Sequence, residues 1–298
     1  MTEITAEETV TRLVDLLTVS EDTKDSYVGR SQIEGVGRVF GGQIIAQALQ
    51  AAQASVDDGF VAHSLHAYFL RGGAEGIETR YAIARDLDGR SFANRHVRAQ
   101  QDDTIILSLT ASFQKDEDGL SHIDARMPDV AGPDELTDDF AMRREVMERA
   151  GDQMSEAQRA IMLRPRPIEM RTAGALHWMN AKPSEPRAFT WFRTAAPLPD
   201  DPALHRAVIA YASDYTLLGT AALPHGLSWF RGELVGASLD HAIWFHAPAK
   251  ADDWLLYATE SPWSGGGRGF NRGHIFSRDG TLVASVAQEG MMRRRKNS

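Results

Sequence analysis

The sequence predicts an α+β fold with two antiparallel sheets, each wrapped around its own helix, in one chain. A largely apolar, helix-forming segment occurs twice, at 43–55 and at 205–222, and strand-like stretches follow each one. A helix that is apolar on nearly all sides has to be enclosed by other elements. The two halves also resemble one another, and 298 residues leave room for about two domains.

The internal repeat can be followed along the chain. When Phe69 is aligned with Phe245, two aromatic-rich strands coincide, and a small slippage then places 107–112 on 285–290. This alignment matches Thr110 with Gln288. Two such units can pair edge to edge, which hides strand edges that would otherwise be exposed. We therefore expect one pseudo-dimer per chain.

The remaining elements repeat this plan. In the first half we expect a helix at 2–18, an extended piece at 27–31, and strands at 62–70, 77–85, 91–100 and 104–114. In the second half we expect extended pieces at 168–173 and 189–194, and strands at 234–246, 254–261, 268–277 and 281–291. A charged, helix-prone stretch lies between them. The expected division is a first domain at 1–118, a helical interdomain connection at 119–162 and a second domain at 163–298.

Composition and charge exclude several classes of function. Hydrophobic residues make up 43% of the chain and charged residues 24%, as in ordinary soluble proteins. The net charge of −9 disfavours a nucleic-acid partner, which requires a basic face. No apolar run approaches the roughly 20 residues that span a bilayer, and the acidic N-terminus does not resemble a secretory signal. We therefore expect a cytoplasmic protein that does not bind membranes.

The sequence gives no sign of a metal site. It contains no cysteine, which removes thiolate ligands and cysteine nucleophiles. Two histidine pairs, His63 with His66 and His241 with His246, are separated by odd numbers of residues. On strands, the members of each pair are expected to face opposite sides, so they cannot share a metal ion. No metal is predicted.

Motifs spread from residue 30 to residue 293 carry a resemblance to a known family. In the first half they are Arg38-Val39-Phe40-Gly41-Gly42-Gln43, His63-Ser64-Leu65-His66-Ala67-Tyr68-Phe69-Leu70-Arg71 and Arg90-Ser91-Phe92. In the second half they are Tyr211-Ala212-Ser213-Asp214, Pro224-His225-Gly226, Asp240-His241-Ala242-Ile243-Trp244-Phe245-His246, Arg268-Gly269-Phe270 and Val283-Ala284-Ser285-Val286-Ala287-Gln288-Glu289-Gly290. In this order the motifs resemble the acyl-CoA thioesterase II family, the TesB-like enzymes.

The resemblance implies a double hot-dog fold that hydrolyses fatty acyl-CoA to free fatty acid and CoA without a cofactor. It also implies assembly into a homodimer or a higher even oligomer. The family's catalytic Asp falls on Asp214, its hydroxyl residue on Ser238, and its Gln on Gln288. The hydroxyl residue is usually Thr in the family. Ser238 keeps the hydroxyl but lacks the methyl group that restrains the rotamer.

Asp214 is the expected general base. It falls within the second apolar helical segment, where a carboxylate must reach solvent or be hydrogen-bonded. In this role it would take a proton from the attacking water, while Ser238 and Gln288 orient that water. Ser238 is not expected to be a nucleophile, because its surroundings lack the G-x-S-x-G motif. The first apolar helix carries glutamines and no carboxylate, so one active site per chain is expected.

The sequence also leaves one further substrate contact and two alternative functions open. Arg268, in a glycine-rich hairpin loop, is a candidate for contact with a CoA phosphate. Asp200 and His205 have the five-residue spacing of the hot-dog (R)-enoyl-CoA hydratases, although the rest of that motif is absent. A non-catalytic acyl-CoA-binding protein on the same fold is a third alternative. The filled catalytic positions and the lack of an accompanying helix-turn-helix disfavour it.

Overall fold

The computed structural model describes residues 4–33, 37–150, 156–174, 182–229 and 231–295. Its helices are α1 (Ala6–Leu17), α2 (Gly41–Ala54), α3 (Asp139–Ala150), α4 (Glu156–Met162), α5 (Pro202–Ser213) and α6 (Leu217–Thr220), with 3₁₀ turns at Pro133–Glu135 and Leu223–His225. Its strands are β1 (Val19–Thr23), β2 (Ser26–Gly29), β3 (Phe60–Phe69), β4 (Thr79–Asp88), β5 (Phe92–Gln101), β6 (Thr104–Lys115), β7 (Ile168–Ala173), β8 (Arg187–Thr194), β9 (Leu234–Ser238), β10 (Asp240–Phe245), β11 (Leu255–Gly265), β12 (Arg268–Ser277) and β13 (Leu282–Arg294). Residues 2 and 3 of the predicted first helix lie outside the described part.

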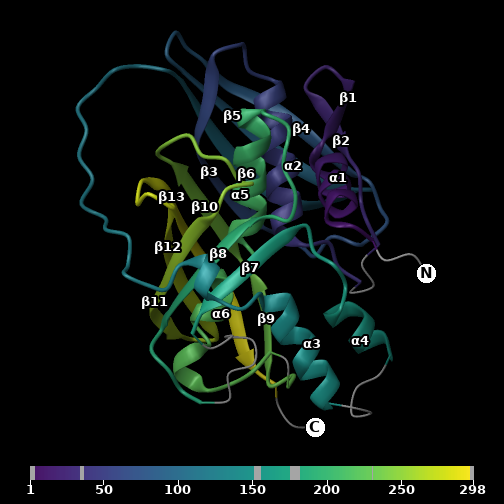
Figure 1. Cartoon of the computed structure of the whole chain (residues 1–298). Helices are drawn as coiled ribbons and strands as arrows, with labels where there is room; N and C mark the ends of the chain where they lie inside the picture. The colour runs from purple at the N-terminus through teal and green to yellow at the C-terminus, as the bar shows by residue number, and fades with distance from the viewer. Residues whose placement is uncertain (1–3, 34–36, 151–155, 175–181, 230, 296–298) are drawn as a thin grey trace.

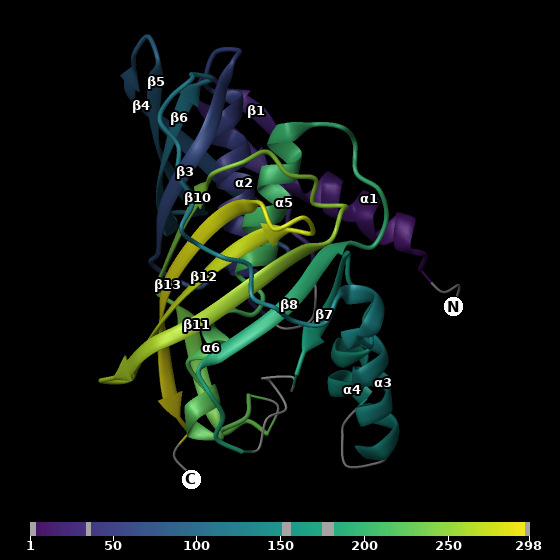
Figure 2. The ribbon, with the colours of Figure 1, turned by 60° about the vertical axis from the view of Figure 1, so that its left-hand side comes forward.

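The strands form a single antiparallel sheet that curves around two helices. Its order is β1-β2-β4-β5-β6-β3-β10-β13-β12-β11-β8-β7, with β9 paired to β13. Helices α2 and α5 lie against each other inside the curved sheet (Figures 1 and 2). Most residues of both helices are buried, as their all-round apolar sequences predict. The predicted double hot-dog, of α+β class, is confirmed.

The two halves join through β3 and β10. These strands pair antiparallel, with His66 opposite Ala242 and Leu65 opposite Ile243. The strand edge that each half would expose on its own is therefore hydrogen-bonded to the other half, as the repeat predicted. The two predicted sheets consequently become one continuous sheet.

Two predicted elements are divided in the structure, and both divisions lie next to Asp214 or its partner Ser238. The predicted helix at 205–222 is divided, because α5 ends at Ser213 and a turn precedes the short α6. Asp214 is therefore the C-cap of α5 and not a mid-helix residue. The predicted strand at 234–246 is also divided at Leu239, whose backbone bonds to Phe69 on one side and to Glu289 on the other. Strand β1 was not predicted.

The connection between the halves contains helices, as expected. Helices α3 and α4 follow one another beside β7, near one end of the sheet (Figure 2); residues 151–155 of this stretch lie outside the described part. The division into domains at 118 and 163 remains our proposal. In the described part of the chain, no helix combines the length and apolarity required to cross a membrane.

The packing of α2 against α5 generates a prediction. A Cβ atom at Gly42 would lie 2.4 Å from the Tyr211 carbonyl oxygen, which is backbone and cannot easily move. We expect Gly42→Ala to lower the free energy of unfolding by about 1–3 kcal/mol through overpacking. Gly119→Ala is the control, because a Cβ there meets nothing within 4 Å. Thermal unfolding measures both, and an unchanged melting temperature for Gly42→Ala would contradict the close contact.

Candidate active site

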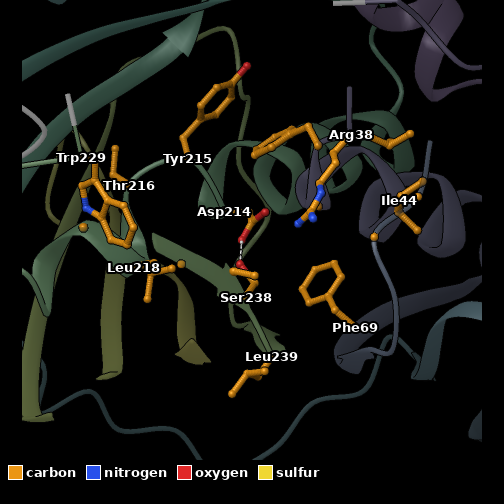
Figure 3. Close-up of a pocket in the computed structure, with 18 of the residues that line it drawn as sticks. Arg38, Ile44, Phe69, Asp214, Tyr215, Thr216, Leu218, Trp229, Ser238 and Leu239 are labelled. Carbon is orange, nitrogen blue, oxygen red and sulfur yellow. Dashed lines mark hydrogen bonds between the residues drawn. The ribbon is translucent and has the colours of Figure 1, made fainter. Parts of the chain in front are cut away.

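A cavity of about 840 Å³ opens where the two halves and the connection meet. Its walls come from four parts of the chain. They are the segment 38–41 with Ile44, the loop 69–73 with Ile106, the connection residues Asp139, Arg143 and Met162, and the second-half residues Arg166, Met170, Asp214, Tyr215, Thr216, Leu218, Gly219, Trp229 and 236–239. Figure 3 shows Asp214 and Ser238 on one wall, with the Arg38 side chain directed into the cavity between Asp214 and Phe69.

Asp214 is held by donors from three separate segments. Its Oδ1 atom accepts a hydrogen bond from Gln288 Nε2 on β13, at 2.6 Å, and one from Ser238 Oγ at the end of β9, at 3.2 Å. The Gly42 backbone N–H at the start of α2 also donates to the carboxylate. The Asp214 side chain is only 5% exposed. The structure thus brings together the three residues that the sequence placed in one site.

Gly41 makes this close approach possible. A Cβ atom at Gly41 would lie 2.5 Å from Asp214 Oδ2, so any larger residue would displace the carboxylate. Burial raises the pKa of Asp214 to about 6, although the bonds from Gln288, Ser238 and Gly42 act in the opposite direction. A carboxyl group with this pKa changes protonation state close to neutral pH, as a general base must.

His241 lies close to Asp214 without forming an ion pair with it. Its Nδ1 atom is 4.0 Å from Asp214 Oδ1, and the ring is completely buried. Burial lowers the pKa of His241 to about 3, so the imidazole is neutral. In a true ion pair, each partner would favour the charged form of the other. Here burial raises the pKa of Asp214 and lowers the pKa of His241, so each group is shifted toward its neutral form. The neutral imidazole therefore contributes a dipole, and no positive charge, to this contact.

Ser238 and Gln288 occupy different positions relative to the cavity. Ser238 lines it, whereas Gln288 is 1% exposed and does not. Gln288 Nε2 also lies 3.0 Å from Ser238 Oγ, so the two residues hold each other as well as Asp214. The amide is therefore behind the cavity wall, where it can fix the other two side chains.

The strand register corrects one expectation about the repeat. With Phe69 aligned on Phe245, Ala67 corresponds to Ile243; Ala67 pairs with Leu109, and Ile243 pairs with Val286. Gln288 therefore corresponds to Ala111, which faces the interior, and not to Thr110. A one-residue slip moves every side chain to the other face of a sheet, so sequence similarity alone misplaced this position.

The described residues contain no cluster of three or more His, Asp or Glu side chains that could hold a metal ion. The expectation that His63 and His66 face opposite sides of the sheet is wrong. A register shift between Ala62 and Ser64 brings His63 to the outer face, where its Nε2 lies 2.9 Å from Ser112 Oγ. His66 is on the same face, opposite Thr110.

Comparisons with known proteins identify the family to which the chain belongs. The family described as acyl-CoA thioesterase matches residues 151–291, and the acyl-CoA thioesterase N-terminal domain matches residues 30–114. Acyl-coenzyme A thioesterase 8 of Rattus norvegicus is 38% identical, over 95% of this chain and 88% of its own length. Acyl-CoA thioesterase 2 of Haemophilus influenzae is 36% identical, over 94% of this chain and 96% of its own. The chain belongs to the acyl-CoA thioesterase family.

Membership of the acyl-CoA thioesterase family also accounts for the fold. The crystal structure of the acyl-CoA thioesterase II TesB2 from Mycobacterium marinum superposes with a TM-score of 0.75 at 36% identity, covering 95% of this chain and 98% of that one. The protein is therefore an enzyme of the thioester hydrolase class.

Other residues singled out from the sequence of this acyl-CoA thioesterase lie elsewhere. Arg268 forms an ion pair with Glu289 at 2.9 Å and is not part of the cavity wall, so its contact with CoA stays a prediction. His205 accepts a bond from the Ala251 amide, and Asp200 pairs with Lys250. Both face a second cavity of about 720 Å³, but no hydrogen bond or ion pair within the described residues joins them.

The cavity has cationic side chains in its wall that the sequence did not predict there. Arg38, Arg71, Arg143 and Arg166 all line it. Arg38 and Arg71 fall inside the family motifs, which was the available signal, whereas Arg143 in the connection and Arg166 shortly after it lie in no motif. The backbone N–H of Gly42 was also missed, because a main-chain donor leaves no mark in the side-chain pattern.

The raised pKa of Asp214 predicts how stability depends on pH. The pKa rises from 3.8 to about 6 on folding, so this group stabilises the fold below about pH 4 and loses that contribution as pH rises through about 6. The expected difference is on the order of 3 kcal/mol. Relative to Asp214→Asn, the wild type should therefore lose stability over this window in thermal or denaturant unfolding. Asp200→Asn, at an 88% exposed side chain, should show no such trend; parallel curves for Asp214→Asn would contradict the buried titration.

Proposed function

We propose that this enzyme hydrolyses fatty acyl-CoA to free fatty acid and CoA, using a water molecule activated by Asp214. The observation that carries the proposal is the buried carboxylate on the cavity wall, held by Ser238 and Gln288 and poised to titrate near neutral pH. The three residues come from α5, β9 and β13, so the fold has to be complete before the group exists.

The proposed reaction follows general base catalysis. The ionised Asp214 takes a proton from a water molecule in the cavity as the water oxygen attacks the thioester carbonyl carbon. The tetrahedral intermediate then collapses, the C–S bond breaks, and the thiolate of CoA takes up the proton held by Asp214. The products are a fatty acid and the CoA thiol. No cofactor takes part in these steps.

Ser238 and Gln288 have different tasks in this proposal. Ser238 lines the cavity and can contact the water directly, and its hydroxyl can both donate and accept. Gln288 is a positioning residue, because it is buried behind Asp214 and Ser238 and donates to both. The departure from the family's usual Thr leaves the hydroxyl at position 238 in place.

The cations of the cavity support a polyanionic substrate. Arg38 and Arg71 lie on neighbouring loops that are tied together by a bond from the Val39 N–H to the Gly73 carbonyl. No carboxylate in the described part of the chain forms an ion pair with either arginine. Because the chain as a whole carries a charge of −9, a local cationic surface would favour the approach of the CoA phosphates.

We also propose that the protein is cytoplasmic and acts as a homodimer or a higher even oligomer. The outer face of the central strands supports self-association. On this face Tyr68 is 62% exposed and Trp244 37%, and the Trp244 ring packs edge-on against His66 at 5.0 Å. Exposed aromatic side chains at the centre of a sheet face are typical of an interaction surface, and a second copy would supply the same residues across a two-fold axis.

Removal of the proposed base gives the main test. Asp214→Asn preserves the shape of the side chain and removes the proton acceptor, so CoA release from an acyl-CoA should fall on the order of 10²-fold or more. Ser238→Ala should lose less, because it removes one orienting bond. In the wild type, kcat/KM should rise with pH through about 6 as Asp214 ionises. A near-wild-type rate for Asp214→Asn, with the protein folded, would show that the mechanism is wrong.

The proposed assembly has its own test. Trp244→Arg places a charge at the centre of the outer sheet face and should shift the protein toward smaller species in light scattering at micromolar concentration. Leu87→Arg is the matched control, since Leu87 is also exposed but lies on β4, four strands away from β10. A wild type that is monomeric under the same conditions would contradict the proposal.

A further inference from the structure

His241 is a buried polar residue that the proposed reaction does not use. It lies on β10 behind the cavity wall, is completely buried and is not part of the cavity lining. Its two ring nitrogens have separate neighbours. Nε2 is 2.9 Å from Ser213 Oγ, and Nδ1 is 3.3 Å from Gln288 Nε2. The ring therefore connects the end of α5 with the amide that holds Asp214.

The hydrogen bonds around Ser213 determine which nitrogen carries the proton. The Ser213 hydroxyl donates to the Ala210 carbonyl oxygen at 2.9 Å, so its only hydrogen is already used. Its oxygen must then accept from the Nε2–H of His241. The lone pair of the neutral ring is consequently on Nδ1 and points at Gln288 Nε2. That nitrogen has two hydrogens and three acceptors face it, so one N–H is shared between two acceptors.

This lone pair matters because, within the described residues, no hydrogen bond holds the oxygen side of the Gln288 amide. Gln288 Oε1 is buried and has no hydrogen-bond partner in the described part of the chain. The orientation of the amide therefore depends on the acceptors that face Nε2, which are Asp214 Oδ1, Ser238 Oγ and His241 Nδ1. If the amide turned over, Oε1 would face the carboxylate and the lone pair of His241, and both contacts would be repulsive.

The acceptor on His241 differs from the one on Asp214 in one respect. Asp214 gains and loses a proton during the proposed reaction, so its attraction for the amide changes within each turnover. His241 stays neutral throughout, since burial disfavours its charged form. The imidazole is thus an acceptor for Gln288 whose charge does not change during turnover.

The repeat indicates that the fold itself does not require this polar pair. In the first half, the positions that correspond to His241 and Gln288 are Leu65 and Ala111, which pair across β3 and β6 and are fully buried. The same place in the same fold is therefore filled by apolar side chains where there is no carboxylate to serve. The polar pair occurs only in the half that holds Asp214.

From these observations, and on the basis of the proposed function, we infer that His241 is a positioning residue for the thioesterase reaction. Through Nδ1 it keeps the Gln288 amide turned with its donors toward Asp214 and Ser238, and Ser213 keeps the imidazole in the tautomer that this requires. Its effect on the reaction passes through Gln288 and not through contact with the substrate.

Three substitutions at position 241 distinguish the contribution of Nδ1 from that of Nε2. His241→Asn puts an amide oxygen near the place of Nδ1 and can still accept from Gln288, His241→Gln reaches the place of Nε2 only, and His241→Leu copies the first half. We expect His241→Leu and His241→Gln to lower kcat about 10-fold, the usual effect of losing one orienting bond, with KM little changed. His241→Asn should recover most of the rate.

The pH profile gives a second readout. The bond from Gln288 lowers the pKa of Asp214, so an amide that is no longer held should let that pKa rise. The midpoint of kcat/KM against pH should therefore move upward in His241→Leu and in Gln288→Ala, and stay near the wild-type value in His241→Asn. A role confined to packing would not move this midpoint.

A double-mutant cycle with Gln288→Ala decides between positioning and packing. If His241 acts through Gln288, adding His241→Leu to Gln288→Ala should cost little further activity. An equal loss in both backgrounds, or a wild-type rate for His241→Leu, would overturn the inference. Should His241→Leu fail to fold, Ser213→Ala takes its place in the cycle. This variant removes the hydroxyl that holds the proton on Nε2 and leaves the imidazole ring in place. Asp214→Asn keeps the two hypotheses apart: if that variant is inactive and His241→Leu is not impaired, only the role of His241 is wrong.

Discussion

The contact between the start of α2 and the end of α5 is the constraint on which the rest of the structure depends. Gly42 lies so close to the Tyr211 carbonyl that a single methyl group would not fit, and Gly41 lies equally close to the Asp214 carboxylate. The end of a helix is usually open to water. Here the other half of the chain covers it, so Asp214 is removed from solvent and receives a backbone N–H in exchange.

This burial sets the chemistry of the site. A carboxylate paired with an arginine would have a low pKa and would be a weak base near neutral pH. Asp214 is held instead by neutral donors, from an amide, a hydroxyl and a peptide N–H, so desolvation dominates and the pKa rises. The neighbouring imidazole contributes no charge, because the same burial keeps it neutral. The site thus combines a fixed geometry with a proton affinity suited to general base catalysis.

The two halves of the chain use the same architecture for different purposes. In α2 the side chain of Gln47 is completely buried; it donates to the Leu16 carbonyl oxygen and accepts from the Tyr81 hydroxyl, which ties α1 and β4 to the helix. In the second half the interior polar side chains gather around Asp214. The first half nevertheless contributes to the cavity through Arg38, Phe69 and Gly41, so the cavity needs both halves.

The sequence by itself determined the class of fold, the two enclosed helices and most strands, because apolar periodicity is a local property that each segment carries alone. Through the resemblance it also singled out Asp214, Ser238 and Gln288, three side chains that the structure brings together. Only the tertiary structure decided that α5 stops before Asp214, that Gln288 corresponds to Ala111, and that His241 faces the amide of Gln288. The physical reason is the same in each case. Helix ends, strand register and the partner of a buried polar atom depend on contacts between residues that are distant in the sequence, and one residue of register changes the face on which a side chain lies.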